Sequence, residues 1–71
     1  MKFTNHALIR MQQRGLDESS VVSAIQNPDE IGDSFGRRKL ARKTIGDKTF
    51  EVVYIKEDDI IVITVYWLEE L

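Results

Sequence analysis

The spacing of apolar residues changes once along the chain, near residue 36, and this change restricts the fold more than any other feature. Before it, apolar residues recur at helical spacing in two short stretches. After it, they alternate with a period of two, as in strands. Helical segments followed by strand segments predict an α+β domain. With 71 residues, the chain has room for a single domain, predicted to span residues 1–71.

The first helix is predicted to run from about Asn5 to Arg14. Thr4 or Asn5 offers a side-chain oxygen that can cap its first turn. Gly15 supplies the left-handed residue that ends it. Phe3, just before this helix, either closes a brief N-terminal strand or plugs the core.

The second helix is predicted to begin after Asp17, whose carboxylate can cap it. Val21 and Ile25 mark its buried face. Asn27 and Pro28 end it, because the residue before a proline is pushed out of the α region. The short connection between the two helices predicts an αα-hairpin.

Three strands are predicted after a polar linker, at residues 37–45, 49–55 and 60–67, with turns at 46–47 and 57–59. The predicted architecture is therefore two N-terminal helices packed on a three-stranded antiparallel meander. The last strand is apolar on both faces. It is therefore either central or covered on its second face by a partner, which leaves a homo-oligomer open.

The composition excludes several classes of protein. The chain has no cysteine and only one histidine, so disulfides, a zinc site and a metal cofactor are not expected. No apolar run approaches the roughly 20 residues that span a membrane, and the first residues lack the apolar core of a signal peptide. The expected location is the cytoplasm. The formal charge of −2 argues against a protein that coats nucleic acid non-specifically.

Positive charge is concentrated in the first predicted strand, where five of the seven residues from 37 to 43 are basic. Such a strip on an acidic body can bind phosphate locally, so these residues are predicted to contact nucleic acid. The alternative is a solvated edge strand, whose charges deter pairing between sheets. The members of this basic strip are Arg37, Arg38, Lys39, Arg42 and Lys43.

His6, Arg10 and Arg14 are spaced by four residues and form one row along the first predicted helix. The two arginines repel each other at this spacing, so a sequence selected for stability alone would favour Glu at one site. The row therefore indicates an anion site. The alternative is ordinary surface arginines that pair with carboxylates, beside a histidine that caps or packs.

Residue chemistry connects this row with RNA cleavage. Metal-free cleavage needs a base for the ribose 2′-hydroxyl, an acid for the leaving oxygen and cations for the phosphate. Histidine is the residue type suited to proton transfer near neutral pH, and His6 is the only one in the chain. Arg10 and Arg14 can bind phosphate oxygens through two hydrogen bonds each. Tyr66 and Tyr54 are candidates for the acid or for stacking platforms; the alternative is that both pack in the core.

The run from His6 to Gly15 has the form H-A-x-x-R-M-x-x-R-G. It resembles the opening of an uncharacterised family of small prokaryotic domains that looks related to the RelE/ParE toxin superfamily. The likeness extends over nearly the whole chain, through the Asn27-Pro28 helix end and the Val-Val and Ile-Val-Ile-Thr-Val-Tyr strands. It implies two helices on a curved antiparallel sheet. It also implies cleavage of free or ribosome-bound mRNA, and a neighbouring antitoxin, although other branches act on gyrase.

Two hypotheses result. The first is a toxin-like, metal-independent endoribonuclease of a toxin–antitoxin system, with His6 and Arg10 central, Arg14 assisting, RNA as substrate and a cognate antitoxin as partner. The second is a non-catalytic module that binds RNA or protein. A degenerate toxin that keeps the fold without the activity remains as a third.

Overall fold

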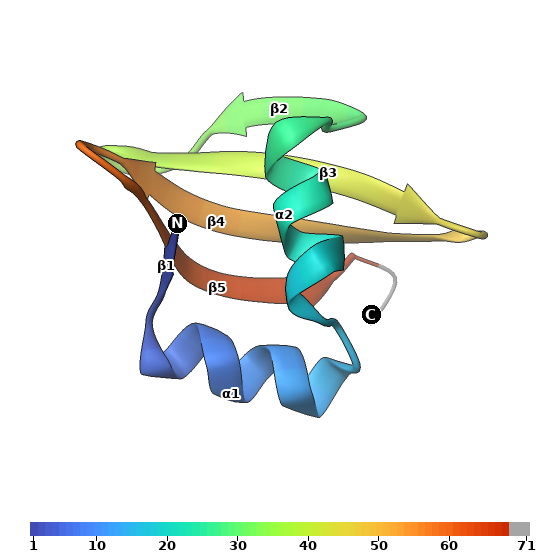
Figure 1. The fold of residues 1–71 in the computed structure, drawn as a ribbon. Coiled ribbons are helices and arrows are strands. Elements are labelled where there is room, and N and C mark those ends of the chain that lie inside the picture. The colour runs from blue at the N-terminus through green and yellow to red at the C-terminus, as the bar shows by residue number, and fades with distance from the viewer. Residues whose placement is uncertain (69–71) are drawn as a thin grey trace.

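In the computed structural model, which describes residues 1–68, two helices lie on one face of a five-stranded sheet (Figure 1). The α+β class predicted from the sequence fits this arrangement. Along the chain the elements are β1 (Lys2–Phe3), α1 (Asn5–Arg14), α2 (Glu18–Gln26), β2 (Glu30–Asp33), β3 (Arg38–Ile45), β4 (Lys48–Lys56) and β5 (Ile60–Trp67).

Both helices begin and end where the sequence predicts. The Thr4 side chain accepts a hydrogen bond from the Ala7 backbone N–H at 3.0 Å, and Gly15 ends α1 with a φ of 67°. The Asp17 carboxylate caps α2 by accepting from the Ser20 N–H at 2.9 Å. Hydrogen bonding from Ser20 stabilises the charged form and lowers the pKa of Asp17.

The predicted three-stranded antiparallel meander is wrong. The sheet has five strands in the order β1-β5-β4-β3-β2, and it is mixed, because β1 pairs parallel with β5 while the other neighbours are antiparallel. The strand β2 forms within the segment that the sequence predicts as a polar linker. Its residues, Glu-Ile-Gly-Asp, carry little strand propensity, and they are extended because β3 supplies their hydrogen-bonding partners.

The two helices pack on the sheet more than on each other. A short turn joins them, as predicted, but α1 packs against β5 and α2 against β3 and β4 (Figure 1). The αα-hairpin prediction therefore holds for the connection and not for the packing. None of the described helices is long and apolar enough to cross a membrane.

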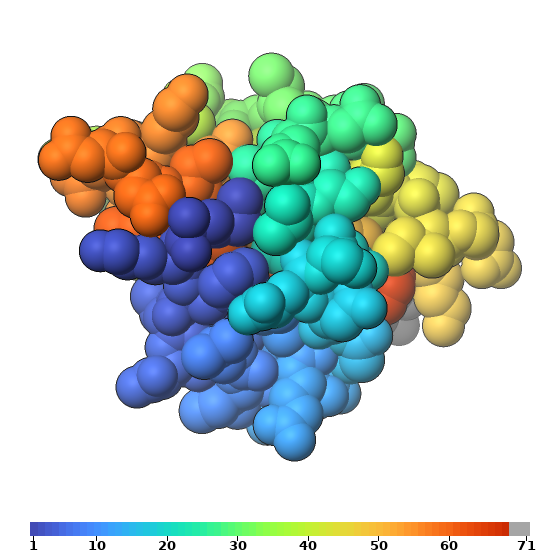
Figure 2. Space-filling model, viewed as in Figure 1, coloured from blue at the N-terminus to red at the C-terminus, as the bar shows by residue number. Residues whose placement is uncertain are grey.

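The register of the strands gives the sheet two different faces. On β4, Phe50, Val52 and Tyr54 face the helices. Glu51 and Val53 face the opposite way, and we call their side the open face. Figure 2 shows the helix-covered side, where both helices lie over the sheet and the β3–β4 turn extends beyond them. The core beneath them consists of Ala7, Met11, Leu16, Val21, Ala24, Phe50, Val52, Val62 and Val65.

Candidate functional site

The predicted cationic row lies along α1. His6 is exposed in the first turn, whereas Arg10, one turn later, and Arg14, in the last turn, are both half-buried. Spacing by four residues keeps all three on one side of α1. The buried face of the same helix carries Ala7 and Met11. The structure therefore keeps the row together as a stripe beside the packed face.

Arg10 keeps its charge available. Its guanidinium Nη1 donates a hydrogen bond to the Gln13 side-chain oxygen at 3.0 Å, and that amide carries no charge. Among residues 1–68, no carboxylate forms an ion pair with Arg10, and the His6 ring has no hydrogen-bond partner. Both side chains can therefore meet an anion from solution.

Arg14 has a different environment. Its backbone carbonyl accepts a hydrogen bond from the Trp67 ring N–H at 2.9 Å, which ties the end of α1 to the end of β5. Its side-chain Nε is screened from solvent. The Nε of Arg14 is therefore closed to an anion from solution.

Most of the basic strip is engaged inside the domain. Arg37 forms an ion pair with Glu57. Lys39 lies with its Nζ 3.6 Å from a carboxylate oxygen of Asp33. Lys43 donates to the backbone carbonyl of Asn27 at 2.8 Å. Side chains that the sequence predicts to bind nucleic acid therefore already have partners inside the domain.

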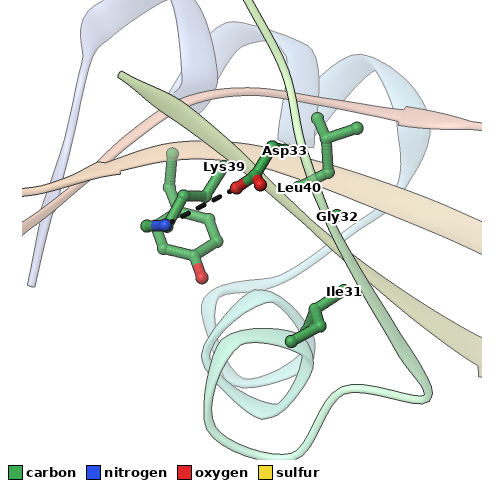
Figure 3. A pocket seen from close by; sticks show the side chains of 6 residues that line it. Ile31, Gly32, Asp33, Lys39 and Leu40 are labelled. Atoms are coloured by element: carbon green, nitrogen blue, oxygen red, sulfur yellow. Dashed lines mark ion pairs between the residues drawn. The ribbon is translucent and has the colours of Figure 1, made fainter. Parts of the chain in front are cut away.

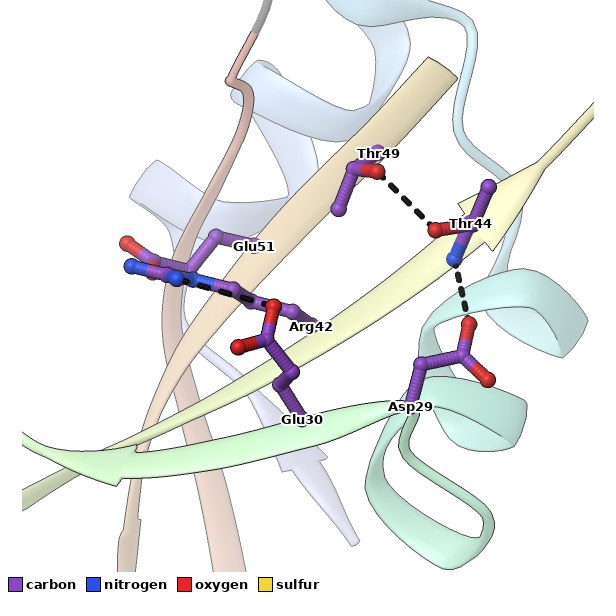
Figure 4. A network of polar contacts seen from close by, with 6 residues as sticks. All are labelled: Asp29, Glu30, Arg42, Thr44, Thr49 and Glu51. Atoms are coloured by element: carbon purple, nitrogen blue, oxygen red, sulfur yellow. Dashed lines mark hydrogen bonds and ion pairs between the residues drawn. The ribbon is translucent and has the colours of Figure 1, made fainter. Parts of the chain in front are cut away.

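Arg42 belongs to the most buried polar contact of the described residues. Its Nε donates to the Glu51 carboxylate at 2.7 Å, and its Nη1 lies 3.8 Å from Glu30 (Figure 4). Glu51 is only 2% exposed. The hydrogen bond to Glu51 raises the pKa of Arg42, with the charge of Glu51 adding to the effect. Sequence reasoning assigned Arg42 to phosphate, and the cross-strand register instead gives it a carboxylate.

The second part of this polar network lies two residues further along β3, near the end of the strand. The Thr44 backbone N–H donates to the Asp29 carboxylate at 2.8 Å, and the hydroxyls of Thr44 and Thr49 are 2.9 Å apart (Figure 4). Asp29 comes directly before β2. The network therefore holds the start of β2 against β3.

Arg38 is the one member of the basic strip whose side chain forms no hydrogen bond or ion pair within residues 1–68. It lies on β3, which β4 separates from β5, the strand on which α1 packs. Neighbouring strands are about 4.8 Å apart, so β3 is roughly 10 Å from β5. The row on α1 and the basic strip are thus two separate surfaces.

The two tyrosines lie on opposite faces of the sheet. Tyr54 packs against the core on the helix-covered face, as its alternative interpretation predicts. Tyr66 is half-buried and lies opposite Glu51 in the β4–β5 register, on the open face. This face is opposite to the row on α1, so Tyr66 stays a candidate for stacking and is not placed to act as the acid beside His6. No group of three histidine or acidic side chains in the described part of the chain can hold a metal ion.

Fold and site together define a small α+β domain with an accessible cationic row on its first helix. Residues 3–67 match the model of the family described as a domain of unknown function, DUF4258, and the chain belongs to this family. No curated protein and no solved structure matches the chain. The family description names no activity, so the function must be inferred from the site.

Proposed function

We propose that this protein is a toxin-like endoribonuclease that cleaves RNA in the cytoplasm without a metal ion. The accessible pair His6 and Arg10 carries the proposal. Arg10 has no carboxylate partner within residues 1–68, whereas four of the five basic-strip side chains bind one or more groups inside the domain. Arg10, whose charge no carboxylate neutralises, lies one turn from the single histidine. This arrangement suits a phosphate group bound by Arg10 and a neighbouring hydroxyl group that gives its proton to His6.

The proposed reaction uses the 2′-hydroxyl of the ribose as nucleophile. Its oxygen forms a bond to phosphorus, and the bond from phosphorus to the 5′-oxygen breaks. His6 accepts the 2′ proton, and water gives a proton to the 5′-oxygen, because Tyr66 lies on the face of the sheet opposite to α1. Arg10 binds the non-bridging oxygens, where negative charge increases in the transition state. The helix dipole adds positive potential at the first turn of α1.

The remaining predicted residues take supporting roles. Arg14 assists by holding α1 on β5 through its carbonyl. Arg38 is the strip residue with a charge left for a distant phosphate. The H-A-x-x-R-M-x-x-R-G motif resembles that of a family that looks related to the RelE/ParE toxin superfamily, and on this ground we extend the proposal to ribosome-bound mRNA as substrate and to a cognate antitoxin as partner.

The proposal is tested with purified protein and labelled mRNA, with and without ribosomes, in the presence of EDTA. Wild-type protein should cleave the RNA. His6→Ala and Arg10→Ala should each lower the rate about tenfold or more. Lys48→Ala removes an exposed cation from the start of β4, beside the β3–β4 turn and far from α1, and serves as the matched control. Absence of cleavage by the wild type, or full activity of His6→Ala, would overturn the assignment.

A second candidate is an RNA-binding module without catalysis. It is favoured by one observation: no described side chain orients the His6 ring, whereas a histidine base is usually held by a partner. This version predicts that Arg10→Ala weakens RNA binding while no cleavage product forms. Binding should weaken steeply with added salt, because phosphate contacts release counterions.

A further inference from the structure

The strand β2 leaves one edge of the sheet unoccupied. It pairs with β3 on one side, and no strand within residues 1–68 pairs with its other side. All four of its residues are exposed. The outer backbone N–H and C=O groups of such an edge are available to an added extended chain.

The largest exposed apolar side chains lie at this edge. Ile31, in β2, is 76% exposed, and Phe35, in the turn that follows, is 93% exposed. No other large apolar side chain among residues 1–68 exceeds the 54% of Ile9. Exposed apolar groups beside an open backbone edge are typical of interaction surfaces.

Gly32 leaves room on the edge for a partner's side chain. A hollow of about 230 Å³ next to it is lined by Ile31, Asp33, Lys39, Leu40 and Tyr54 (Figure 3). A Cβ atom at Gly32 would have only Leu40 Cδ1 near it, at 4.0 Å. A glycine inside an edge strand marks a place where another chain can approach closely.

Charge selects what can approach. Glu30 and Asp33 stand at the two ends of β2. Their contacts with Arg42 and Lys39 are long, at 3.8 and 3.6 Å, and the two carboxylates are 68% and 87% exposed. Each can therefore accept a second cation from outside.

The same charges oppose pairing with a second copy of the chain. Two β2 strands in antiparallel register would place Glu30 of one copy opposite Asp33 of the other at both ends. Like charges directly opposite each other destabilise a strand pair. The charges of β2 therefore disfavour pairing between two copies of the chain in this register and favour pairing with a segment that carries positive charges.

We infer that the outer edge of β2 docks an extended segment of a partner protein, in which two basic residues flank two apolar ones. The segment adds as a sixth strand beside the five of the sheet. Its cations face Glu30 and Asp33, one apolar side chain contacts Ile31, and the other fills the space at Gly32 beside Leu40. Phe35 covers the end of the added strand.

The probes are capped, fluorescently labelled hexapeptides of the form Thr-Lys-Φ-Φ-Lys-Thr, with every combination of Val, Ile, Leu and Phe at the two Φ positions. At least one should bind the full chain saturably in fluorescence anisotropy. It should also slow amide hydrogen exchange in β2. Ile31→Ser, Phe35→Ser and Asp33→Lys should each weaken that binding about fivefold or more.

Matched controls distinguish binding at β2 from non-specific binding to other exposed apolar side chains. Ile9→Ser and Ile45→Ser remove exposed apolar side chains from α1 and from the end of β3, and peptide binding should not change. His6→Ala should also leave it unchanged, so the result is independent of RNA cleavage. A peptide methylated on alternate backbone nitrogens keeps its side chains but cannot complete the ladder, and it should not bind.

Three results would overturn the inference. They are failure of every peptide to bind, equal binding by the methylated peptide, and unchanged binding by both Ile31→Ser and Phe35→Ser. An equally tight complex with peptides that carry Glu in place of Lys would overturn the charge argument.

Discussion

Arg42 and Glu51 carry opposite charges across neighbouring strands, and their environments are unequal. Glu51 is almost fully buried on the open face, while the Arg42 side chain is 38% exposed. A carboxylate removed from water needs a charged or strongly hydrogen-bonding partner. Arg42 supplies both, which explains why a residue of the basic strip is committed to the fold.

Removal of Arg42 should therefore cost more stability than neutralisation of Glu51. Arg42→Ala leaves a buried charge without its cation, whereas Glu51→Gln removes the charge itself and leaves an exposed arginine head that water can solvate. We expect Arg42→Ala to lower Tm by about 10 °C and Glu51→Gln by clearly less. Thermal unfolding followed by circular dichroism measures both. A larger loss of Tm in Glu51→Gln than in Arg42→Ala would show that the buried charge of Glu51 is not what makes the ion pair important for stability.

At the scale of elements, α2 depends on its N-cap residue, Asp17. The Asp17 carboxylate accepts hydrogen bonds from the Ser20 backbone at 2.9 Å and from the Ser19 hydroxyl at 3.3 Å. These contacts are made by the charged form, and they lower the pKa of Asp17 below its ordinary value of 3.8. The cap is therefore linked to pH.

The sign of this linkage follows from the direction of the shift. A depressed pKa in the folded state contributes stability above pH 3.8, and this contribution is lost as the pH falls through the folded-state value. Asp17→Ala should lower Tm by a few degrees at pH 7, and the difference from wild type should shrink below about pH 3.8. Asp17→Asn caps without a charge and should lose less at pH 7. A pH-independent difference for Asp17→Ala would contradict the prediction.

The whole molecule has a small core with little stability in reserve. A domain of this size buries only about 60% of its unfolded surface. Phe50 lies fully buried on the central strand β4 and packs edge-to-face on Trp67 with ring centroids 5.6 Å apart. This one side chain connects β4, β5 and, through the Trp67 bond to Arg14, the end of α1.

Phe50→Ala should abolish the folded state at 37 °C. Loss of a buried phenylalanine costs about 3–5 kcal/mol, which is comparable to the whole stability of a small domain. Phe35→Ala is the matched control, because Phe35 is 93% exposed and its truncation should leave Tm within about 2 °C of wild type. Far-UV circular dichroism and a urea titration distinguish the two variants. A cooperative transition in Phe50→Ala close to that of the wild type would show that the core is not centred there.

Local sequence determined the elements that depend on local chemistry. Thr4, Gly15, Asp17 and Pro28 set the ends of both helices, because caps and proline act within a turn of the residue itself. Spacing by four likewise placed His6, Arg10 and Arg14 on one side of α1. The alternation of apolar residues predicted β3, β4 and β5 to within a few residues.

Tertiary structure alone decided what depends on partners distant in sequence. The strands β1 and β2 exist because β5 and β3 complete their hydrogen bonds. The sequence allows β1 as one of two alternatives for Phe3, and Glu-Ile-Gly-Asp carries little strand propensity of its own. The partners of the basic strip are set in the same way, by the register that brings Glu51 beside Arg42 and by the place of β2 at the sheet edge. Pairing across strands is a property of the assembled sheet, and a single segment of sequence does not contain it.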